Sequence, residues 1–158
     1  MEKEFTVGAI VVNRFGVLNR VSALFSKRRY NIKSLAVGEI DNPNFSRITI
    51  VVTGDDYVKE QVVKQLNKLQ DVHRVELLNN DMATSREHML IKLKSTPENA
   101  NKITTLTNGF AGKIVSFSDD TVTIEITGDQ GTTDEVIERA KEIGIIEVCR
   151  AGVVALAR

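Results

Sequence analysis

The sequence predicts an α+β protein in which one unit, strand–helix–strand–strand–helix–strand, occurs twice. Two observations lead to this prediction. Short runs rich in Val and Ile alternate along the chain with stretches of helical periodicity. In addition, the segment Ile48–Asp55 matches Val122–Asp129, 74 residues later, and each is an apolar run that ends in Gly-Asp before a helical pattern. An internal repeat of this kind defines the building block of the fold.

The first half of the chain supplies the first unit. Its opening strand, Phe5–Val12, is almost entirely apolar, which is typical of a central strand covered on both faces. A helix is expected near residues 16–29, because Val17, Leu18, Val21, Leu24 and Phe25 fall on one face at helical spacing. Two strands around a polar turn, a second helix and a last strand complete the unit. These elements are Ile32–Ile40, Ser46–Thr53, residues 57–69 and Val72–Leu78.

The second half repeats this order. A strand, His88–Leu93, precedes a helix that is expected to begin at Thr96-Pro97-Glu98. Thr caps helices, Pro fits the first helical position and Glu suits the first turn. The remaining elements are the strands Lys113–Phe117 and Thr121–Thr127, a helix near residues 133–143, and a strand Ile145–Leu156 that is interrupted at Gly152.

Two copies of this order form the split-βαβ, ferredoxin-like architecture, in which two helices cover one face of an antiparallel sheet. The polar stretch 79–85 is the expected linker, so the predicted domains are residues 1–78 and 86–158. A unit of about 75 residues buries a small share of its surface, and its sheet has open edges. We therefore expect the sheets to pair between the domains or between subunits.

Composition excludes several classes of protein. The chain has 21 basic and 21 acidic residues, so no nucleic acid is expected as a partner. No apolar run approaches the roughly 20 residues that span a membrane, and the N-terminus resembles neither a signal peptide nor a transit peptide. The single cysteine, Cys149, allows no intramolecular disulfide and indicates a reducing compartment. We therefore expect a cytoplasmic protein, with Cys149 as a buried apolar residue.

The sequence also offers no catalytic or metal-binding arrangement. His73 and His88 stand on presumed strands without the cysteine or carboxylate spacing of a metal site. The paired aspartates at 55–56 and 119–120 suit turns and helix caps rather than acid–base catalysis. No Ser/His/Asp or Cys/His combination suggests nucleophilic catalysis. We therefore expect a chain that is not an enzyme, with no metal and no cofactor of its own.

The segment Asn13–Leu18 is the strongest candidate for a binding site. It joins the first strand to the first helix, with Gly16 at the helix start. A helix N-terminus presents unpaired N–H groups and a partial positive charge, which suit a carboxylate. The Asn13 amide offers donors and an acceptor, which suit an adjacent ammonium group. Asn13 and Gly16 are also ordinary residues of a strand-to-helix turn, but a second amide, Asn31, at the far end of the helix favours a pocket for a small amino acid.

The position of Asn31 predicts a homodimer. About 15 residues separate Gly16 from Asn31, so the helix between them is roughly 20 Å long, and one ligand cannot touch both of its ends within one subunit. If both amides serve one site, they come from different subunits related by a two-fold axis. The equivalent turn of the second half, Lys94–Glu98, lacks the Asn-x-x-Gly pattern, and Glu98 would repel a carboxylate. No ligand of the same kind is expected there.

Four segments resemble the small, regulatory subunit of acetolactate (acetohydroxyacid) synthase. The similarity extends over essentially the whole chain. The first block is shared by ACT domains in general, whereas Tyr30–Leu35 (YNIKSL) and Arg150–Val154 (RAGVV) are more specific. The four segments are Asn13–Leu18, Leu24–Leu35, Ser46–Ile50 and Glu147–Leu156.

The resemblance implies that the N-terminal half is an ACT domain that binds a branched-chain amino acid, usually valine, at a dimer interface. The C-terminal half would activate the catalytic (large) subunit, which itself would hold thiamine diphosphate, Mg²⁺ and FAD. The implied function is feedback regulation of branched-chain amino acid biosynthesis by a non-catalytic subunit. The effector-binding residues implied in this way are Asn13, Gly16, Val17 and Leu18 of one subunit with Asn31 and Ile32 of its partner.

Three other functions fit parts of the sequence. An ACT-domain sensor that serves a different biosynthetic enzyme would use the same residues. An acylphosphatase-like enzyme shares the fold but needs an arginine-bearing phosphate loop after the first strand, and the turn there supplies only Arg14. An RNA-recognition module stacks bases on aromatic residues of its central strands, and the central strands here offer only Phe5.

Overall fold

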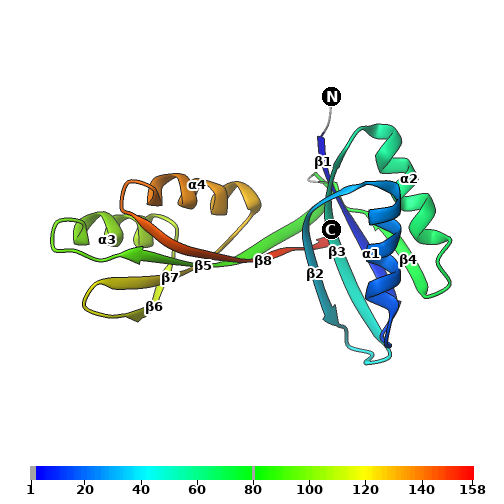
Figure 1. Cartoon of the computed structure of the whole chain (residues 1–158), viewed down its shortest axis with the longest axis horizontal. Coiled ribbons are helices and arrows are strands. Elements are labelled where there is room, and N and C mark those ends of the chain that lie inside the picture. Colours follow the sequence, from blue (N-terminus) through cyan, green and yellow to red (C-terminus); the bar gives the residue numbers. More distant parts are fainter. Residues whose placement is uncertain (1–2, 80) are drawn as a thin grey trace. The chain divides into compact units, whose positions relative to one another are not determined.

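The structure, a computed structural model, describes residues 3–79 and 81–158. The chain divides into two compact units, which are described separately (Figure 1). The first unit contains the residues up to Ser85 together with Val153–Arg158, and the second contains Arg86–Gly152. The last six residues therefore belong with the first unit, whereas the sequence division assigned them to the second domain. Residue 80 of the predicted linker and residues 1–2 lie outside the described residues.

The first unit is an antiparallel sheet with two helices on one face (Figure 1). Its elements are β1 (Lys3–Val12), α1 (Val17–Arg28), β2 (Asn31–Glu39), β3 (Phe45–Gly54), α2 (Asp56–Asn67) and β4 (Val72–Leu77). The strand order is β2-β3-β1-β4, so β2 and β4 are the edges of the sheet. Helix α2 packs along β4, and α1 contacts α2 beside it.

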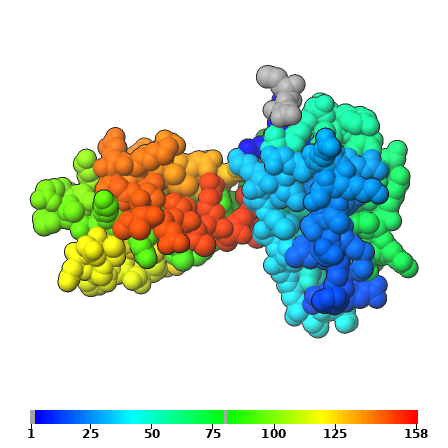
Figure 2. Space-filling model, in the orientation of Figure 1, coloured from blue at the N-terminus to red at the C-terminus, as the bar shows by residue number. Residues whose placement is uncertain are grey.

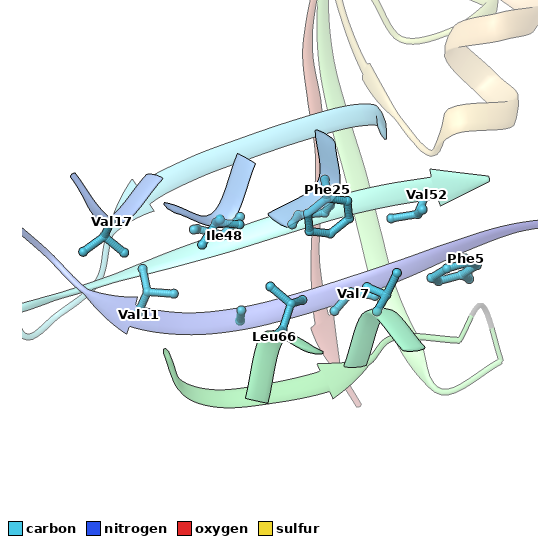
Figure 3. Close-up of a cluster of buried hydrophobic side chains, with 12 residues drawn as sticks. Phe5, Val7, Val11, Val17, Phe25, Ile48, Val52 and Leu66 are labelled. Carbon is cyan, nitrogen blue, oxygen red and sulfur yellow. The ribbon is translucent and has the colours of Figure 1, made fainter. Parts of the chain in front are cut away.

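One hydrophobic core lies between these helices and the sheet (Figure 3). Successive side chains of a strand face opposite ways, so alternate residues of β1, including Val7, Ala9 and Val11, point toward the helices. Phe25 of α1 and Leu66 of α2 pack against them. All five side chains are at most 2% exposed. This packing fixes the position of α1 over the end of β1.

The second unit repeats the same plan. Its elements are β5 (Ala83–Lys94), α3 (Ala100–Gly109), β6 (Lys113–Phe117), β7 (Thr121–Gly128), α4 (Gln130–Ala140) and β8 (Ile145–Ala157). The strand order, β6-β7-β5-β8, is equivalent to that of the first sheet, and the unit has its own hydrophobic core. Strand β5 begins, and strand β8 ends, among residues of the first unit. The prediction of two βαββαβ units is confirmed.

The Gly-Asp pairs of the internal repeat stand at the starts of α2 and α4. The Asp55 carboxylate accepts a hydrogen bond from the Val58 N–H (2.8 Å), and the Asp129 carboxylate accepts one from the Thr132 N–H (2.8 Å). Both aspartates are therefore N-caps. Because Asp129 caps α4, this helix begins at Gln130, earlier than the predicted residue 133.

Helix α3 begins at Ala100 rather than at the predicted Thr96-Pro97-Glu98. The Asn99 side-chain oxygen accepts a hydrogen bond from the Thr96 N–H (2.9 Å), and the Asn99 amide donates to the Lys94 carbonyl oxygen (2.9 Å). These bonds hold residues 97–99 in a turn that precedes the helix. The predicted helix start is wrong because the Asn99 side chain satisfies backbone groups outside the helix.

The predicted burial of Cys149 is also wrong. Val148 packs against the second core, and its neighbour Cys149, on the edge strand β8, faces the opposite way and is exposed. The same strand continues through Gly152, which has a φ of +85°. The backbone therefore departs locally from the usual strand conformation at Gly152, but the predicted interruption of the strand is not found.

Candidate functional site

The turn between β1 and α1 contains four of the predicted binding residues, Asn13, Gly16, Val17 and Leu18. Gly16 precedes α1 with a φ of +85°, a left-handed conformation that glycine adopts without strain. The first turn of α1 contains no acidic residue, so the helix itself does not neutralise its positive end or its free N–H groups. The start of α1 can therefore attract an anionic group.

Asn13 ties this turn to the loop between β2 and β3. Its backbone N–H donates to the Asn44 carbonyl oxygen (2.7 Å). Its side-chain amide donates to the Pro43 carbonyl oxygen (2.9 Å) and to Glu39 Oε2 (3.0 Å). Because Asn13 is exposed and its amide hydrogens point to these acceptors, its Oδ1 oxygen is the atom best able to accept a hydrogen bond from a ligand.

Two arginines, Arg14 in the turn and Arg20 in α1, form hydrogen bonds with the Asp71 carboxylate. Arg14 Nη2 lies 2.7 Å from Asp71 Oδ1, and Arg20 Nε lies 2.6 Å from Asp71 Oδ2. The Asp71 carbonyl oxygen also accepts a hydrogen bond from the Val12 N–H (2.9 Å). The hydrogen bond from Arg14, and then that from Arg20, hold the pKa of Asp71 below its ordinary value. Two guanidinium groups on one carboxylate leave excess positive charge beside the start of α1, which adds to the attraction for an anion.

The apolar residues at the start of α1 differ in exposure. Val17 is 3% exposed and points into the core (Figure 3). Leu18 is 44% exposed, and the side chain of Phe15 is fully exposed. Val17 can therefore offer a ligand only its backbone, whereas Leu18 has an accessible apolar side chain.

Asn31 and Ile32 lie at the other end of the sheet. Asn31 is opposite Thr53, and Thr53 is opposite Glu4 near the start of β1, whereas Asn13 follows the end of that strand. Roughly 25–30 Å of strand length therefore separates Asn13 from Asn31. The structure brings the four residues of the turn together and does not bring Asn31 or Ile32 to them within one chain.

The edge of the sheet beside α1 is apolar and accessible. Strand β2 pairs with β3 on one side only, which leaves backbone groups of β2 open to a further strand. Leu35 is 37% exposed and Val37 is 46% exposed on this strand. The segments of α1 and β2 form part of the surface in view in Figure 2. Open backbone groups and accessible apolar side chains therefore occur together along this edge.

In the equivalent turn of the second unit, the side-chain amide is already hydrogen-bonded to backbone groups of the same chain. The Asn99 amide there donates to the carbonyl oxygens of Lys94 (2.9 Å) and Ile143 (3.4 Å).

Within residues 3–79 and 81–158, no group of three or more His, Cys, Asp and Glu side chains is placed to hold a metal ion. No helix in the same ranges is long and apolar enough to cross a membrane.

Sequence reasoning missed the contribution of Asp71. This residue is separated by 57 and 51 positions from Arg14 and Arg20, and it stands in a short connection between α2 and β4 that carries no binding motif. Its role follows only from the sheet order, which places the start of β4 beside the end of β1.

Comparison with known proteins identifies the family. The family described as AHAS small subunit-like ACT domain matches residues 8–74, and the one described as small subunit of acetolactate synthase matches residues 86–158. The chain is 44% identical over 149 residues to the acetolactate synthase small subunit of Aquifex aeolicus, and the matched region covers 94% of this chain and 78% of the relative. It is 42% identical over 150 residues to the acetolactate synthase small subunit of Bacillus subtilis, and this match covers 94% of this chain and 87% of the relative.

A solved structure agrees with these matches. The crystal structure of the acetolactate synthase small subunit from Thermotoga maritima superposes with a TM-score of 0.91 and 36% identity, covering 99% of this chain and 98% of that one. The fold, the two family matches and the full-length relatives point to one conclusion. As its sequence motifs predicted, this chain belongs to the family of acetolactate synthase small subunits.

Proposed function

We propose that this chain is a non-catalytic regulatory subunit of acetolactate synthase. It activates the catalytic subunit and transmits feedback inhibition by valine in branched-chain amino acid biosynthesis. The match of both halves of the chain to the small-subunit family supports this proposal most strongly. The catalytic subunit would hold the thiamine diphosphate, Mg²⁺ and FAD of the holoenzyme.

The effector would bind at the start of α1. Its carboxylate would face Gly16 and the first N–H groups of the helix, where the helix dipole and the charge of Arg14 and Arg20 favour an anion. Its ammonium group would donate to Oδ1 of Asn13. Its isopropyl group would contact the exposed side chain of Leu18. The Val17 N–H already donates to the Arg14 carbonyl oxygen (3.4 Å), so Val17 would line the site with its backbone without donating to the ligand.

A second copy of the chain would complete each site. Asn31 and Ile32 are too far from Asn13 to reach the same ligand within one chain, so Asn31 of the partner subunit and Ile32 of the partner subunit would close the pocket. The accessible β2 edge, with Leu35 and Val37, supports this arrangement because a two-fold axis beside it would cover both the open backbone groups and the apolar side chains.

Valine can inhibit only if it binds one state of the holoenzyme more tightly than another. Couplings of this kind are about 1–3 kcal/mol, which corresponds to about a 5- to 150-fold difference in affinity. A ligand that bridges two subunits can supply this difference, because its contacts exist in one dimer arrangement and are lost or weakened in another.

Substitution of the two amides tests the proposal. In holoenzyme reconstituted with the catalytic subunit, Asn13→Ala and Asn31→Ala should retain activation and raise the valine inhibition midpoint about 10-fold or more, because a hydrogen bond to a charged group contributes about 1.5–3 kcal/mol. Asn101→Ala, at an exposed position of α3, is the matched control. An unchanged valine inhibition midpoint in both variants would refute the site. Failure of the wild-type chain to activate the catalytic subunit would instead favour an ACT-domain sensor that serves another enzyme.

A further inference from the structure

The last residues of β8 lie on the sheet face of the first unit that α1 and α2 leave open. Ile48 points into the core between the helices and the sheet, so the preceding residue, Arg47, points to the opposite face. There, Arg47 Nη2 donates to the Ala155 carbonyl oxygen (3.0 Å) and to Glu76 Oε1 (2.7 Å). Ala155 is 5% exposed and packs with Leu78 in a small separate cluster. The end of β8 is therefore an integral part of the first unit.

A second contact joins β8 to the strand that carries Asn31. The Val153 N–H donates to Ser34 Oγ (3.0 Å), and these residues are 119 positions apart in the sequence. Ser34 follows an irregularity in the pairing of β2 with β3, where the register shifts between Ile32 and Ser34. Such a bulge allows a local change of strand geometry. Ser34 is thus two residues from Ile32 and in direct contact with β8.

Two residues before Gly152, β8 is held in the second unit. Arg150 donates from Nε to Glu87 Oε1 (2.6 Å) and from Nη2 to Glu87 Oε2 (2.7 Å). Glu87 is 3% exposed and also accepts from the Thr133 hydroxyl of α4 (2.8 Å). Arg150 Nη1 donates to Asp134 of the same helix (2.8 Å). The Glu87 carboxylate is buried and Arg150 supplies its compensating charge, so this pair resists separation, because withdrawing Arg150 would leave a buried charge unpaired.

Gly152 separates these two anchors. Its φ of +85° is a conformation that other residues rarely adopt. Arg150 and Val153 are therefore joined by only two residues, one of which is conformationally permissive, and each is tied by named hydrogen bonds to a different unit. The sequence segments most specific to the family resemblance, Tyr30–Leu35 and Arg150–Val154, meet here through Ser34 and Val153.

We propose that the hydrogen bond from Val153 to Ser34 couples the effector site to the second unit. This inference rests on the proposed function. A ligand held by Asn31 and Ile32 of one subunit would fix the bulge in β2, and Ser34 would pass the change through Val153 to the Arg150 anchor on β5 and α4. Ser34 is a positioning residue in this scheme, because it acts through β8 and does not touch the ligand.

The test is Ser34→Ala in the full chain. Valine affinity of the small subunit, measured by calorimetry, should stay within about threefold of wild type, and activation of the catalytic subunit without valine should be unchanged. The maximal inhibition at saturating valine should fall by half or more. Ser34→Thr keeps the hydroxyl and should restore inhibition. Ser116→Ala, which changes the exposed serine at the equivalent bulge of β6, should behave as wild type.

Each outcome decides the proposal. Full inhibition of the Ser34→Ala holoenzyme would overturn the coupling role. A loss of valine affinity of more than about tenfold would also overturn it, because Ser34 would then belong to the effector site itself. If wild-type chain fails to bind valine in the same calorimetry, the proposed function fails first and the coupling role with it, and this result is distinguishable from the other two.

Discussion

Asp71 links the candidate effector site to the opposite edge of the first sheet. Its carboxylate receives hydrogen bonds from Arg14 at 2.7 Å and from Arg20 at 2.6 Å, and these two arginines flank Gly16 in the sequence. The same carboxylate therefore positions the turn and balances part of its charge. Because the charge of Asp71 is favoured in the folded state, the stability of the first unit depends on pH.

Asp71→Asn should make this pH dependence visible. The pKa of Asp71 is lowered by Arg14 and Arg20, so its contribution to stability is fully present above the unfolded value of about 3.9 and is lost as the pH falls below it through the folded value. The difference in urea midpoint between wild type and variant should be constant from about pH 7 to 5 and shrink toward pH 3. A constant difference down to pH 3 would contradict this, and Asp119→Asn in an exposed turn is the control.

At this scale, sequence reasoning succeeds where the chemistry is local. Gly16 and the polar Asn13 can be identified from the sequence because strand-to-helix turns have known residue preferences, whereas the left-handed conformation of Gly16 is a finding of the structure. The sequence does not separate the buried Val17 from the exposed Leu18, and it places Cys149 on the wrong face, because the choice of face depends on which neighbour packs against the core. Asp71 gave no local signal, since its partners lie more than 50 positions away.

At the scale of elements, the repeated Gly-Asp pair has a definite structural cause. In the first unit, a Cβ added to Gly54 would lie 2.6 Å from Val58 Cγ1, and in the second, one added to Gly128 would lie 2.7 Å from Thr132 Cγ2. The first turn of the following helix therefore packs directly on each glycine. The repeat marks a close approach between strand and helix, with the aspartate cap beside it.

Gly128→Ala should destabilise the protein by about 1–3 kcal/mol, because the added methyl group forces the first turn of α4 to shift. Gly109→Ala at the end of α3 is the matched control, since no other side chain lies within 4 Å of its added Cβ, and it should be neutral or slightly stabilising. Urea unfolding of both variants gives the comparison. Equal effects of the two substitutions, or a neutral Gly128→Ala, would contradict the close-approach explanation.

Elements were predicted well where periodicity is long and less well at their ends. The core stripe of α1 and the apolar strands β1, β3 and β7 have patterns that permit few alternatives. The start of α3 was misplaced because Asn99 bonds to Lys94 and Ile143, and the second of these is 44 positions away. Cap preferences alone favoured Thr96, and only the tertiary contacts of Asn99 reverse that preference.

At the scale of the whole molecule, β8 is the element whose residues are shared between the two compact units. Its final residues have the alternating pattern of any strand, and that pattern does not say which sheet they cover. The hydrogen bonds between Val153 and Ser34 and between Arg47 and Ala155 show that the end of β8 contacts the first sheet. The two-unit plan itself was predictable, because the internal repeat and the order of elements occur in the sequence.

The central claim is that each effector site combines Asn13 of one subunit with Asn31 of its partner. Co-expression of two differently tagged chains, one Asn13→Ala and one Asn31→Ala, yields a mixed dimer that tests it most directly. If the claim holds, one site of this dimer carries both substitutions and the other carries neither. Calorimetry should therefore find one valine site of wild-type affinity per mixed dimer and none in either homodimer. A mixed dimer without a wild-type site would show that the two amides do not act across subunits.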